Sequence, residues 1–193
     1  MDLPKIENRT GELLSPYAVT KATVESYAST FNKVYGLETV GLRYFNIFGP
    51  RQSPDGPYAA VIPKFMDAIY NNKESTIYGD GEQTRDFTYV ENAVNANILA
   101  LFSEDLKDFG IAFNVACGET ISINNLYITI KKEFTELLQN EILADVKHVS
   151  ERLGDVRNSL ADLTNIKKYL NYEPKITVSD GIKNTVEWYL IGR

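Results

Sequence analysis

The sequence predicts an α/β protein in which strands alternate with helices, and three observations support this fold class. Segments with apolar residues at helical spacing alternate with short β-prone segments along the chain. Ser15-Pro16 and Gly36 match the start and stop signals of a helix, and a β-prone run follows directly. Hydrophobic residues make up 44% and charged residues 24% of the 193 residues, which is typical of a globular protein with a packed core.

The first expected helix runs from Ser15, a favourable N-cap, to about Tyr35. Its apolar residues recur at spacings of three and four and form a stripe: Val24, Tyr27, Phe31 and Val34. Residues 39–45 are β-prone and predict a buried strand. The chain up to about Phe45 therefore reads as one βαβ fragment.

The rest of the chain reads as a smaller mixed α/β lobe. Residues 46–60 hold three prolines and two glycines, so we expect a long irregular loop, and such loops are often functional. After this loop we expect helices over 61–70, 91–103 and 122–138, and two more helices capped by Asp162 and Ser179. We expect strands over 75–78, 86–90, 112–116 and 145–149, and a turn over 79–82.

Composition and charge exclude several classes of function. The formal net charge of −6 argues against nucleic acid as a partner. Cys117 is the only cysteine and His148 the only histidine, which excludes an internal disulfide and multi-histidine or thiolate metal sites. No apolar run approaches the roughly 20 residues of a membrane span. The polar N-terminus does not resemble a signal peptide, so we expect a cytoplasmic protein without a membrane partner.

Tyr17 and Lys21 form the first candidate catalytic couple. Residues four apart share a helix face, and an ammonium near a phenol favours the phenolate, which suits acid/base chemistry at a carbinol. The spacing alone is weak evidence, because Tyr127 and Lys131 match it too. We assign that second pair to packing, since Tyr127 lies inside an apolar helical pattern.

Candidate binding residues follow the expected strands and turns. Asn46 lies at the end of a strand, where its amide could bind a phosphate or a sugar hydroxyl or simply begin a turn. Arg85 and Arg152 lie near glycine turns and suit bidentate phosphate contacts. The alternative is that they pair with Asp86 and Asp155, and composition does not decide between the two.

Five sequence blocks occur in a fixed order: SPYAVTK (15–21), LRYFNIFGPRQ (42–52), AVIPK (60–64), GDGEQTRDF (79–87) and GDVRNSLAD (154–162). Together they resemble the extended short-chain dehydrogenases/reductases of the nucleotide-sugar epimerase type, and within that family the UDP-N-acetylglucosamine 4-epimerases. The resemblance covers nearly the whole chain. It implies a Rossmann-type NAD(P)-binding fold with a smaller substrate-binding lobe, NAD as cofactor and a UDP-sugar as substrate.

The resemblance also implies roles near the cofactor. Tyr17 matches the tyrosine that exchanges a proton with the sugar 4-hydroxyl while NAD takes the hydride. Lys21 matches the lysine that holds the nicotinamide ribose, and Tyr44 matches a tyrosine beside the nicotinamide. We therefore expect Tyr17 and Lys21 to be catalytic, and these two together with Tyr44 to bind the cofactor.

For the substrate, the resemblance implies contacts along the whole nucleotide. Asn46, Arg85 and Arg152 match residues that contact the diphosphate. Ala60 and Val61 match the stretch along the uracil, and Asp155 matches the aspartate that reaches the ribose. Ser159 matches the position that controls the size of the sugar pocket, where a small residue leaves room for an N-acetyl group.

The sequence departs from the family pattern in one large respect. None of the 12 glycines forms the GxGxxG loop that seats the cofactor pyrophosphate. The resemblance therefore implies a truncated form that matches the C-terminal part of the family. We expect residues 1–60 to be a remnant of the dinucleotide-binding domain. Residues 61–193 are then mainly the substrate-binding lobe, with some segments returning to the Rossmann core.

Several functions stay open on this basis. The first is an NAD-dependent 4-epimerase for UDP-N-acetylglucosamine and UDP-N-acetylgalactosamine, serving nucleotide-sugar and surface-polysaccharide biosynthesis. A nucleotide-sugar dehydratase or a UDP-glucuronate epimerase of the same family is the alternative, as is a non-catalytic UDP-sugar binding module. The helix that bears Tyr17 and Lys21 is expected either to pack inside the chain or to join a second copy in a homodimer.

Overall fold

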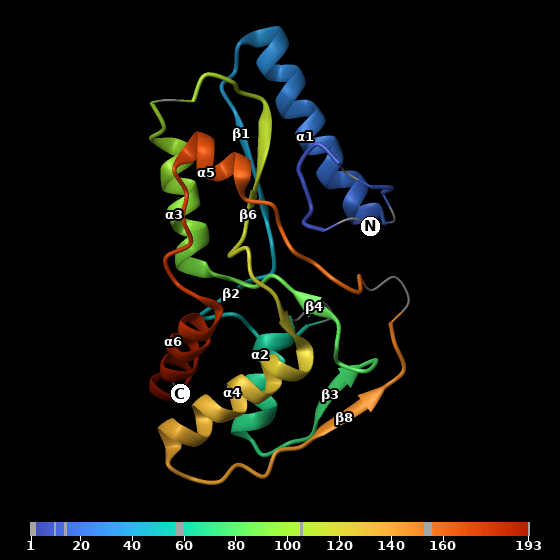
Figure 1. The fold of residues 1–193 in the computed structure, drawn as a ribbon, viewed down its shortest axis with the longest axis vertical. Coiled ribbons are helices and arrows are strands. Elements are labelled where there is room, and N and C mark those ends of the chain that lie inside the picture. The colour runs from blue at the N-terminus through green and yellow to red at the C-terminus, as the bar shows by residue number, and fades with distance from the viewer. Residues whose placement is uncertain are drawn as a thin grey trace.

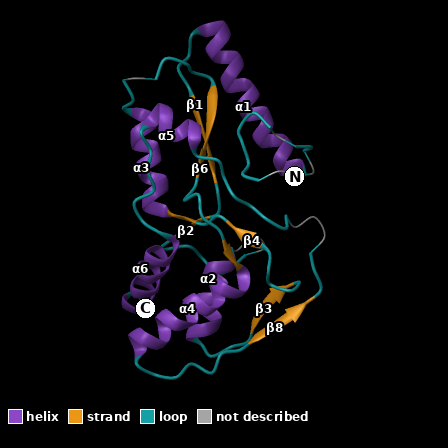
Figure 2. Cartoon of the chain, viewed as in Figure 1, coloured by secondary structure: helices purple, strands orange, loops and turns teal. Residues whose placement is uncertain are grey.

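The computed structural model describes residues 3–9, 11–13, 15–56, 60–104, 106–152 and 156–192. The helices are α1 (Pro16–Tyr35), α2 (Val61–Tyr70), α3 (Val90–Leu101), α4 (Ile123–Leu138), α5 (Thr164–Leu170) and α6 (Val178–Ile191). The strands are β1 (Val40–Tyr44), β2 (Ile47–Phe48), β3 (Ser75–Tyr78), β4 (Thr84–Arg85), β5 (Thr88–Tyr89), β6 (Ile111–Val115), β7 (Ile121–Ser122) and β8 (Val146–Val149). Helices and strands alternate along the chain, which confirms the α/β class (Figures 1 and 2).

The upper half of the molecule, as drawn in Figure 1, consists of α1, β1, α3, β6 and α5. Strands β1 and β6 pair in parallel, with Val40 opposite Ile111 and Tyr44 opposite Val115. In this view α1 lies on one side of the two strands, whereas α3 and α5 lie on the other. A buried apolar cluster fills the space between the strands, α3 and α5: Ala96, Phe113, Val115, Ile166, Leu170 and Tyr172 among others.

Helix α1 forms where its signals place it. The Ser15 side chain accepts a hydrogen bond from the Ala18 N–H at 3.1 Å, and Pro16 occupies the first turn. Gly36 ends the helix in the left-handed conformation, with φ 68°. The Arg43 guanidinium on β1 pairs with the Glu25 carboxylate of α1 through two contacts of 2.7 and 2.6 Å, which fixes the helix against the strand.

The apolar stripe of α1 is not buried by the described part of the chain. Val24, Tyr27 and Val34 are each 63% exposed, and no residue of α1 is buried. The expectation that this helix packs inside the chain is therefore wrong for the described residues. The strand over 39–45 was also expected to be buried. Strand β1 is only half-buried, because among the described residues β6 pairs with one of its edges and no strand pairs with the other.

The lower half consists of the remaining helices and strands and has the larger core. Helices α2, α4 and α6 pack on one another. The rings of Tyr70, Phe134 and Tyr189, one from each helix, all contact one another, with centroids 5.5 to 6.2 Å apart. Strands β3 and β8 pair in parallel, as do β2 and β5, whereas β4 and β7 are antiparallel. The short strands therefore form pairs, not one continuous sheet.

Several local expectations need correction. The loop over 46–60 contains β2, the expected strand over 86–90 is shortened to β5 with β4 as a separate strand before it, and β7 precedes α4. Helix α5 begins after Leu163, with the Asp162 carboxylate accepting the Thr164 N–H, so Asp162 is not its N-cap. Thr177, not Ser179, caps α6, because its hydroxyl accepts the Asp180 N–H.

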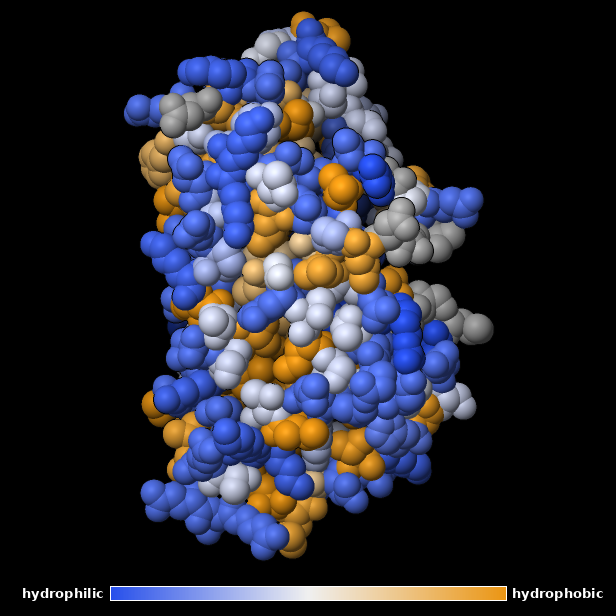
Figure 3. Space-filling view, viewed as in Figure 1, coloured by the Kyte–Doolittle hydropathy of each residue, from blue (hydrophilic) through white to orange (hydrophobic). Residues whose placement is uncertain are grey.

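Hydrophobic side chains reach the surface in both halves of the face drawn in Figure 3, separated by polar ones. Large exposed apolar residues occur on α1, on α3 and at the C-terminal end of α6, including Phe31, Leu101 and Ile191. No helix among the described residues is long and apolar enough to cross a bilayer.

Candidate functional site

A cleft of about 220 Å³ opens in the lower half between β2, the N-terminus of α2, β3 and β4. Its lining brings together residues that are far apart in the sequence: Asn46, Ile47, Phe48, Ala60, Val61, Ile62, Thr76, Tyr78, Gln83, Arg85, Phe87, Ile123 and Arg152. Five of the expected substrate-binding residues lie in this one cleft: Asn46, Ala60, Val61, Arg85 and Arg152. Residues predicted separately from sequence blocks therefore share a site.

The N-terminus of α2 forms one wall of the cleft. Ala60 is its N-cap but makes no side-chain capping hydrogen bond. The first-turn amides of a helix lack partners within the helix and carry the positive end of its dipole. Because Ala60, Val61 and Ile62 line the cleft, these amides offer hydrogen bonds to an acceptor there. This wall suits carbonyl or anionic oxygens of a ligand.

Asn46 is fixed between β1 and β2 in a conformation that side chains seldom adopt. Its φ is 38°, and its side-chain amide donates to the backbone carbonyl of Asp86 at 3.0 Å. Asparagine tolerates the left-handed region better than most residues, and such conformations concentrate at functional sites. The turn directs Asn46 into the cleft, where its amide oxygen can accept and its N–H₂ can donate.

Arg85 on β4 is oriented by main-chain carbonyls. Its Nη1 donates to the Thr84 carbonyl at 2.9 Å and to the Arg157 carbonyl at 3.3 Å. These contacts fix the direction of the guanidinium within the cleft. An arginine held in this way is pre-organised for a charged ligand.

Arg152 provides the second cationic group of the cleft. Its guanidinium carbon lies 3.7 Å from the centroid of the Tyr78 ring, which is the stacked arrangement of a cation–π contact. Hydrogen bonding to the Arg152 side chain, together with its positive charge, lowers the pKa of the Tyr78 phenol. Arg152 and Tyr78 also line a neighbouring cavity of about 100 Å³, together with Gln83, Glu151, Val156 and Arg157.

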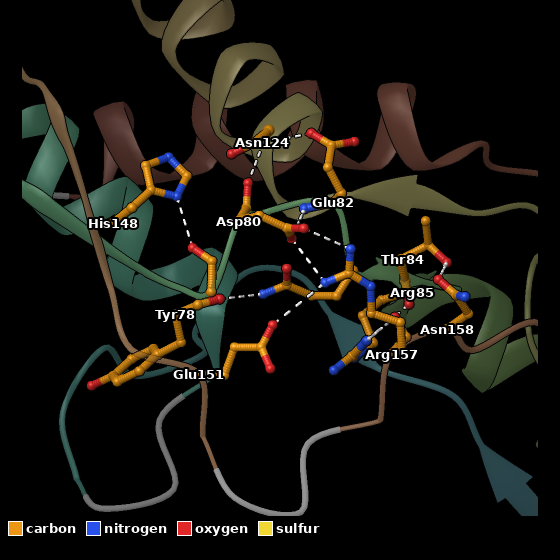
Figure 4. A network of polar contacts seen from close by, with 12 residues as sticks. Tyr78, Asp80, Glu82, Thr84, Arg85, Asn124, His148, Glu151, Arg157 and Asn158 are labelled. Carbon is orange, nitrogen blue, oxygen red and sulfur yellow. Dashed lines mark hydrogen bonds and ion pairs between the residues drawn. The ribbon is translucent and has the colours of Figure 1, made fainter.

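Ion pairs join the turn after β3 to the segment that carries Arg152 (Figure 4). The Arg157 guanidinium makes two contacts with the Asp80 carboxylate, of 2.9 and 2.7 Å, and one of 3.8 Å with Glu151. Arg157 thereby lowers the pKa of Asp80 to about 2. The side-chain amide of Asn124 on α4 donates to the Asp80 carbonyl and to the Glu82 carboxylate.

Asp86, the residue after Arg85, joins the cleft to segments that come from the upper half of the molecule. Its fully buried carboxylate accepts hydrogen bonds from the backbone amides of Cys117, Gly118 and Ala161, at 3.0, 3.2 and 3.2 Å. Burial raises the pKa of Asp86 to about 6, although the three amides act in the opposite direction. Asp86 therefore fixes the segment after β6 and the segment before α5 beside Arg85.

The three residues expected at the cofactor do not line this cleft. Tyr17 and Lys21 lie on α1, where the Lys21 ammonium is 5.3 Å from the centroid of the Tyr17 ring and Tyr17 is 70% exposed. Tyr44 lies at the end of β1, and its hydroxyl pairs with the side-chain amide of Asn97 on α3. The chain thus presents the Tyr17–Lys21 pair in the upper half and the polar cleft in the lower half.

Ser159 and Asp155 were expected to contact the sugar and the ribose. Ser159 is 8% exposed, and its backbone N–H donates to the Thr84 carbonyl at 3.1 Å, so it lies directly beside β4 and Arg85. It is not among the residues that line the cleft. Asp155 lies outside the described residues.

The second Tyr–Lys pair has a structural role. The Tyr127 hydroxyl and the Lys131 ammonium both donate to the Ala144 carbonyl, at 2.9 and 2.6 Å. Tyr127 is buried in the core of the lower half. The pair therefore holds the segment before β8 against α4, which agrees with its assignment to packing.

Sequence reasoning gave no role to Tyr78, Gln83 or Asp80, although all three surround the cleft or its supporting turn. A signal was present, because Gly79 and Gly81 flank Asp80 and both have positive φ, at 76° and 78°. A side chain at Gly81 would collide with Asn124 of α4. The two glycines therefore mark a turn whose shape is fixed.

The arrangement can hold a ligand with an anionic part and a flat apolar part. Arg85, Arg152 and the α2 N-terminus provide positive charge and hydrogen-bond donors on the walls. Phe48, Phe87 and Ile123 provide apolar surface in the same cleft. No group of three or more His, Cys, Asp or Glu side chains arranged for a metal ion occurs in the described part of the chain.

Comparison with known proteins gives a consistent result. The family model of GDP-mannose 4,6-dehydratase matches residues 2–185. A UDP-glucuronate 4-epimerase of Thermodesulfobacterium geofontis is 36% identical over 177 residues, which are 91% of this chain and 50% of that protein. The chain thus spans about half the length of this relative.

Solved structures agree in fold. The UDP-N-acetylglucosamine 4-epimerase of Methanobrevibacter ruminantium, solved with UDP-N-acetylmuramic acid, has a TM-score of 0.87 at 42% identity and is matched over all of this chain and 59% of its own. The UDP-glucuronic acid 4-epimerase of Bacillus cereus, solved with UDP-glucuronic acid and NAD, has a TM-score of 0.85 at 27% identity, over 100% of this chain and 58% of its own. The chain therefore has the mixed α/β, Rossmann-like fold of these epimerases, over part of their length. The chain belongs to the GDP-mannose 4,6-dehydratase family, within the nucleotide-sugar epimerases of the extended short-chain dehydrogenases/reductases.

Proposed function

We propose that this chain carries the UDP-sugar site of an NAD-dependent epimerase that acts at C4 of a UDP-hexose, with UDP-N-acetylglucosamine and UDP-N-acetylgalactosamine as substrates. The observation that supports this most strongly is the single cleft that unites Asn46, the α2 N-terminus, Arg85 and Arg152. Two arginines and free helix amides suit a diphosphate and the carbonyls of a pyrimidine. Such an enzyme would supply a nucleotide-sugar for polysaccharide synthesis.

In this proposal the uracil lies along Ala60 and Val61, and Asn46 binds the diphosphate with Arg85 and Arg152. Asp155 takes the ribose hydroxyls. Ser159 supports the choice of an N-acetylated sugar, because it is small and lies next to Arg85 through its bond to Thr84. A large aromatic side chain at this position would take up the space that an N-acetyl group needs.

Tyr17, Lys21 and Tyr44 would hold the nicotinamide end of NAD. Tyr17 and Lys21 share one exposed helix face and Tyr44 ends β1, so all three present polar groups to a ligand outside the described core. When bound, NAD accepts and returns the hydride of the sugar C4. The Tyr17 hydroxyl exchanges a proton with the sugar 4-hydroxyl, and the Lys21 ammonium stabilises the phenolate that forms.

A second candidate function is a UDP-sugar binding module without chemistry. One observation favours it: none of Tyr17, Lys21 and Tyr44 lines the cleft. A dehydratase or a UDP-glucuronate epimerase would use the same cleft with a different sugar. The two candidate functions differ in whether this chain binds NAD.

Calorimetry with the chain tests the proposal. We expect UDP to bind, and Arg85→Ala to weaken binding about tenfold to a hundredfold because a charge-assisted contact to phosphate is lost. Lys132→Ala is the matched control, since Lys132 is an exposed cation on α4 that pairs only weakly with Glu136, at 3.6 Å. Absence of UDP binding, or an equal loss in both variants, would overturn the proposal.

A second titration separates the two functions. With UDP bound, NADH fluorescence should report binding that Lys21→Ala and Tyr44→Ala weaken. UDP binding without NADH binding would favour the binding module for this chain.

A further inference from the structure

Arg157 contacts the cleft only indirectly, yet it touches both ends of the turn that leads into β4. Its side chain makes the two-contact pair with Asp80 at the start of the turn (Figure 4). Its backbone carbonyl accepts the Thr84 N–H at 3.0 Å and the Arg85 Nη1 at 3.3 Å at the end of the turn. One residue thus links the ion pair to the guanidinium that lines the cleft.

The segment after Arg157 follows β4 closely. The Thr84 hydroxyl donates to the Asn158 side-chain oxygen at 3.0 Å, and the Ser159 N–H donates to the Thr84 carbonyl at 3.1 Å. A short ladder of hydrogen bonds therefore joins β4 to residues 157–159, and the Arg157 carbonyl is part of this ladder. Two carbonyls of this ladder accept from Arg85 Nη1: that of the adjacent Thr84 at 2.9 Å, and that of Arg157, from the opposite segment, at 3.3 Å.

Asp80 is itself held in place, so it can act as a fixed partner. Its carboxylate accepts the Glu82 N–H at 2.9 Å, and its carbonyl accepts the Asn124 amide at 2.9 Å. Helix α4 thereby anchors the turn. A planar guanidinium that meets a fixed carboxylate through two contacts is restricted in both position and direction.

We propose that Arg157 is a positioning residue for the diphosphate: its pair with Asp80 sets the place of the Arg157 carbonyl, and that carbonyl orients Arg85 toward the ligand. This inference rests on the proposed UDP-sugar site and assigns it a supporting pair. Both side chains are about half exposed, and exposed ion pairs contribute little to folding stability. The expected role of the pair is therefore geometric, with a larger effect on ligand binding than on stability.

The test compares UDP with uridine on the full chain. Arg157→Gln and Asp80→Asn should each weaken UDP binding about threefold to tenfold and leave uridine binding unchanged, because only UDP has the diphosphate. The double variant should be no weaker than either single variant, since both remove one pair. Arg157→Lys should recover only part of the affinity, because lysine restores the charge without the planar contact.

Controls separate positioning from general loss of structure. Lys132→Gln removes an exposed cation from the later part of α4, where it pairs with Glu136, and should affect neither ligand. The thermal midpoints of Arg157→Gln and Lys132→Gln should be similar. Equal loss of UDP and uridine affinity in Arg157→Gln, or unchanged UDP affinity, would overturn the inference.

A second measurement does not depend on the ligand. The ¹⁵N order parameter of the Arg85 Nε–H bond should fall in Arg157→Gln and stay unchanged in Lys132→Gln. If wild-type protein binds no UDP, the proposed function fails, and this measurement alone decides the positioning role. An unchanged Arg85 order parameter in Arg157→Gln would refute that role whether or not UDP binds.

Discussion

The two halves of the molecule differ in how completely their helices are buried. In the lower half, α2, α4 and α6 enclose Phe134 and Ile182, both fully buried. In the upper half, α1 lies against β1 and β6 and yet has no buried residue. A complete core thus supports the cleft, whereas the helix with Tyr17 and Lys21 leaves its apolar stripe uncovered.

This difference in burial indicates which half the described residues are sufficient to pack. The lower half has three strand pairs, the contacts among α2, α4 and α6, and a cleft that brings together residues from separate sequence blocks. The upper half has a two-stranded parallel layer, and parallel layers in proteins are normally covered and wider. We therefore expect variants in the two halves to differ in stability and in association.

Truncation of one aromatic residue in each half gives the largest expected contrast. Phe134→Ala should lower the free energy of unfolding by about 3–5 kcal/mol, because it leaves a cavity among Tyr70, Tyr189 and their neighbours. Phe31→Ala should lower it by less than about 1 kcal/mol, since Phe31 is 42% exposed. Urea denaturation measures both, and equal losses would show that α1 is as well packed as α4.

Asp86 gives the next largest effect, because it ties the halves together. Its folded pKa of about 6 lies above the ordinary value of about 3.9, so the stabilisation it gives when protonated is present below pH ~4 and lost as the pH rises through 6. Relative to Asp86→Asn, the wild-type free energy of unfolding should fall by about 2 kcal/mol from pH 4 to pH 7.

Urea midpoints measured at several pH values test this, with Asp108→Asn as a control for loss of an exposed carboxylate. Parallel pH profiles for the wild type and Asp86→Asn would contradict it.

Asp80 acts in the opposite sense. Its pKa of about 2 lies below the ordinary value, so its contribution to folding stability is present above pH ~4 and lost as the pH falls through 2.

The sequence predicted the parts of the fold that depend on local signals. Ser15 with Pro16, Gly36 and Ser122 mark helix ends that the structure confirms. By contrast, β2, β5 and β7 are only two residues long, and their pairing partners lie far away in the chain. Strands of this length depend on tertiary pairing, so no local pattern identifies them.

Prediction of the candidate site has the same limit: contacts between distant segments cannot be inferred from local sequence patterns. The family resemblance identified Asn46, Arg85 and Arg152, and the structure brings them into one cleft. Asp80 and Arg157 lie 77 positions apart, so their pairing could not be inferred from spacing. For α6, Thr177 and Ser179 are both suitable caps, and only the backbone course selects Thr177.

Self-association tests the exposed stripe directly. The exposed stripe of α1 is apolar and aromatic, and no described part of the chain covers it. We therefore expect copies of the chain to associate through α1. Tyr27→Glu should weaken association about tenfold or more in sedimentation experiments, because it places a charge in the contact. Leu143→Glu is the control, since Leu143 is an exposed apolar residue of the lower half. A monomeric wild-type chain at high concentration would refute the prediction.

The smallest expected effect concerns Tyr78, whose ring lies below Arg152 at the edge of the cleft. Tyr78→Leu removes the aromatic face, so Arg152 loses one of the contacts that orient it, and UDP binding should weaken about twofold to fourfold. Tyr78→Phe keeps the face and should bind UDP as the wild type does. Calorimetry measures both variants, and the free energy of unfolding should change little in either. If Tyr78→Phe weakened binding as much as Tyr78→Leu, the hydroxyl and not the ring would be the group that matters. The cleft would then depend on a polar contact at this edge in place of the stacked guanidinium.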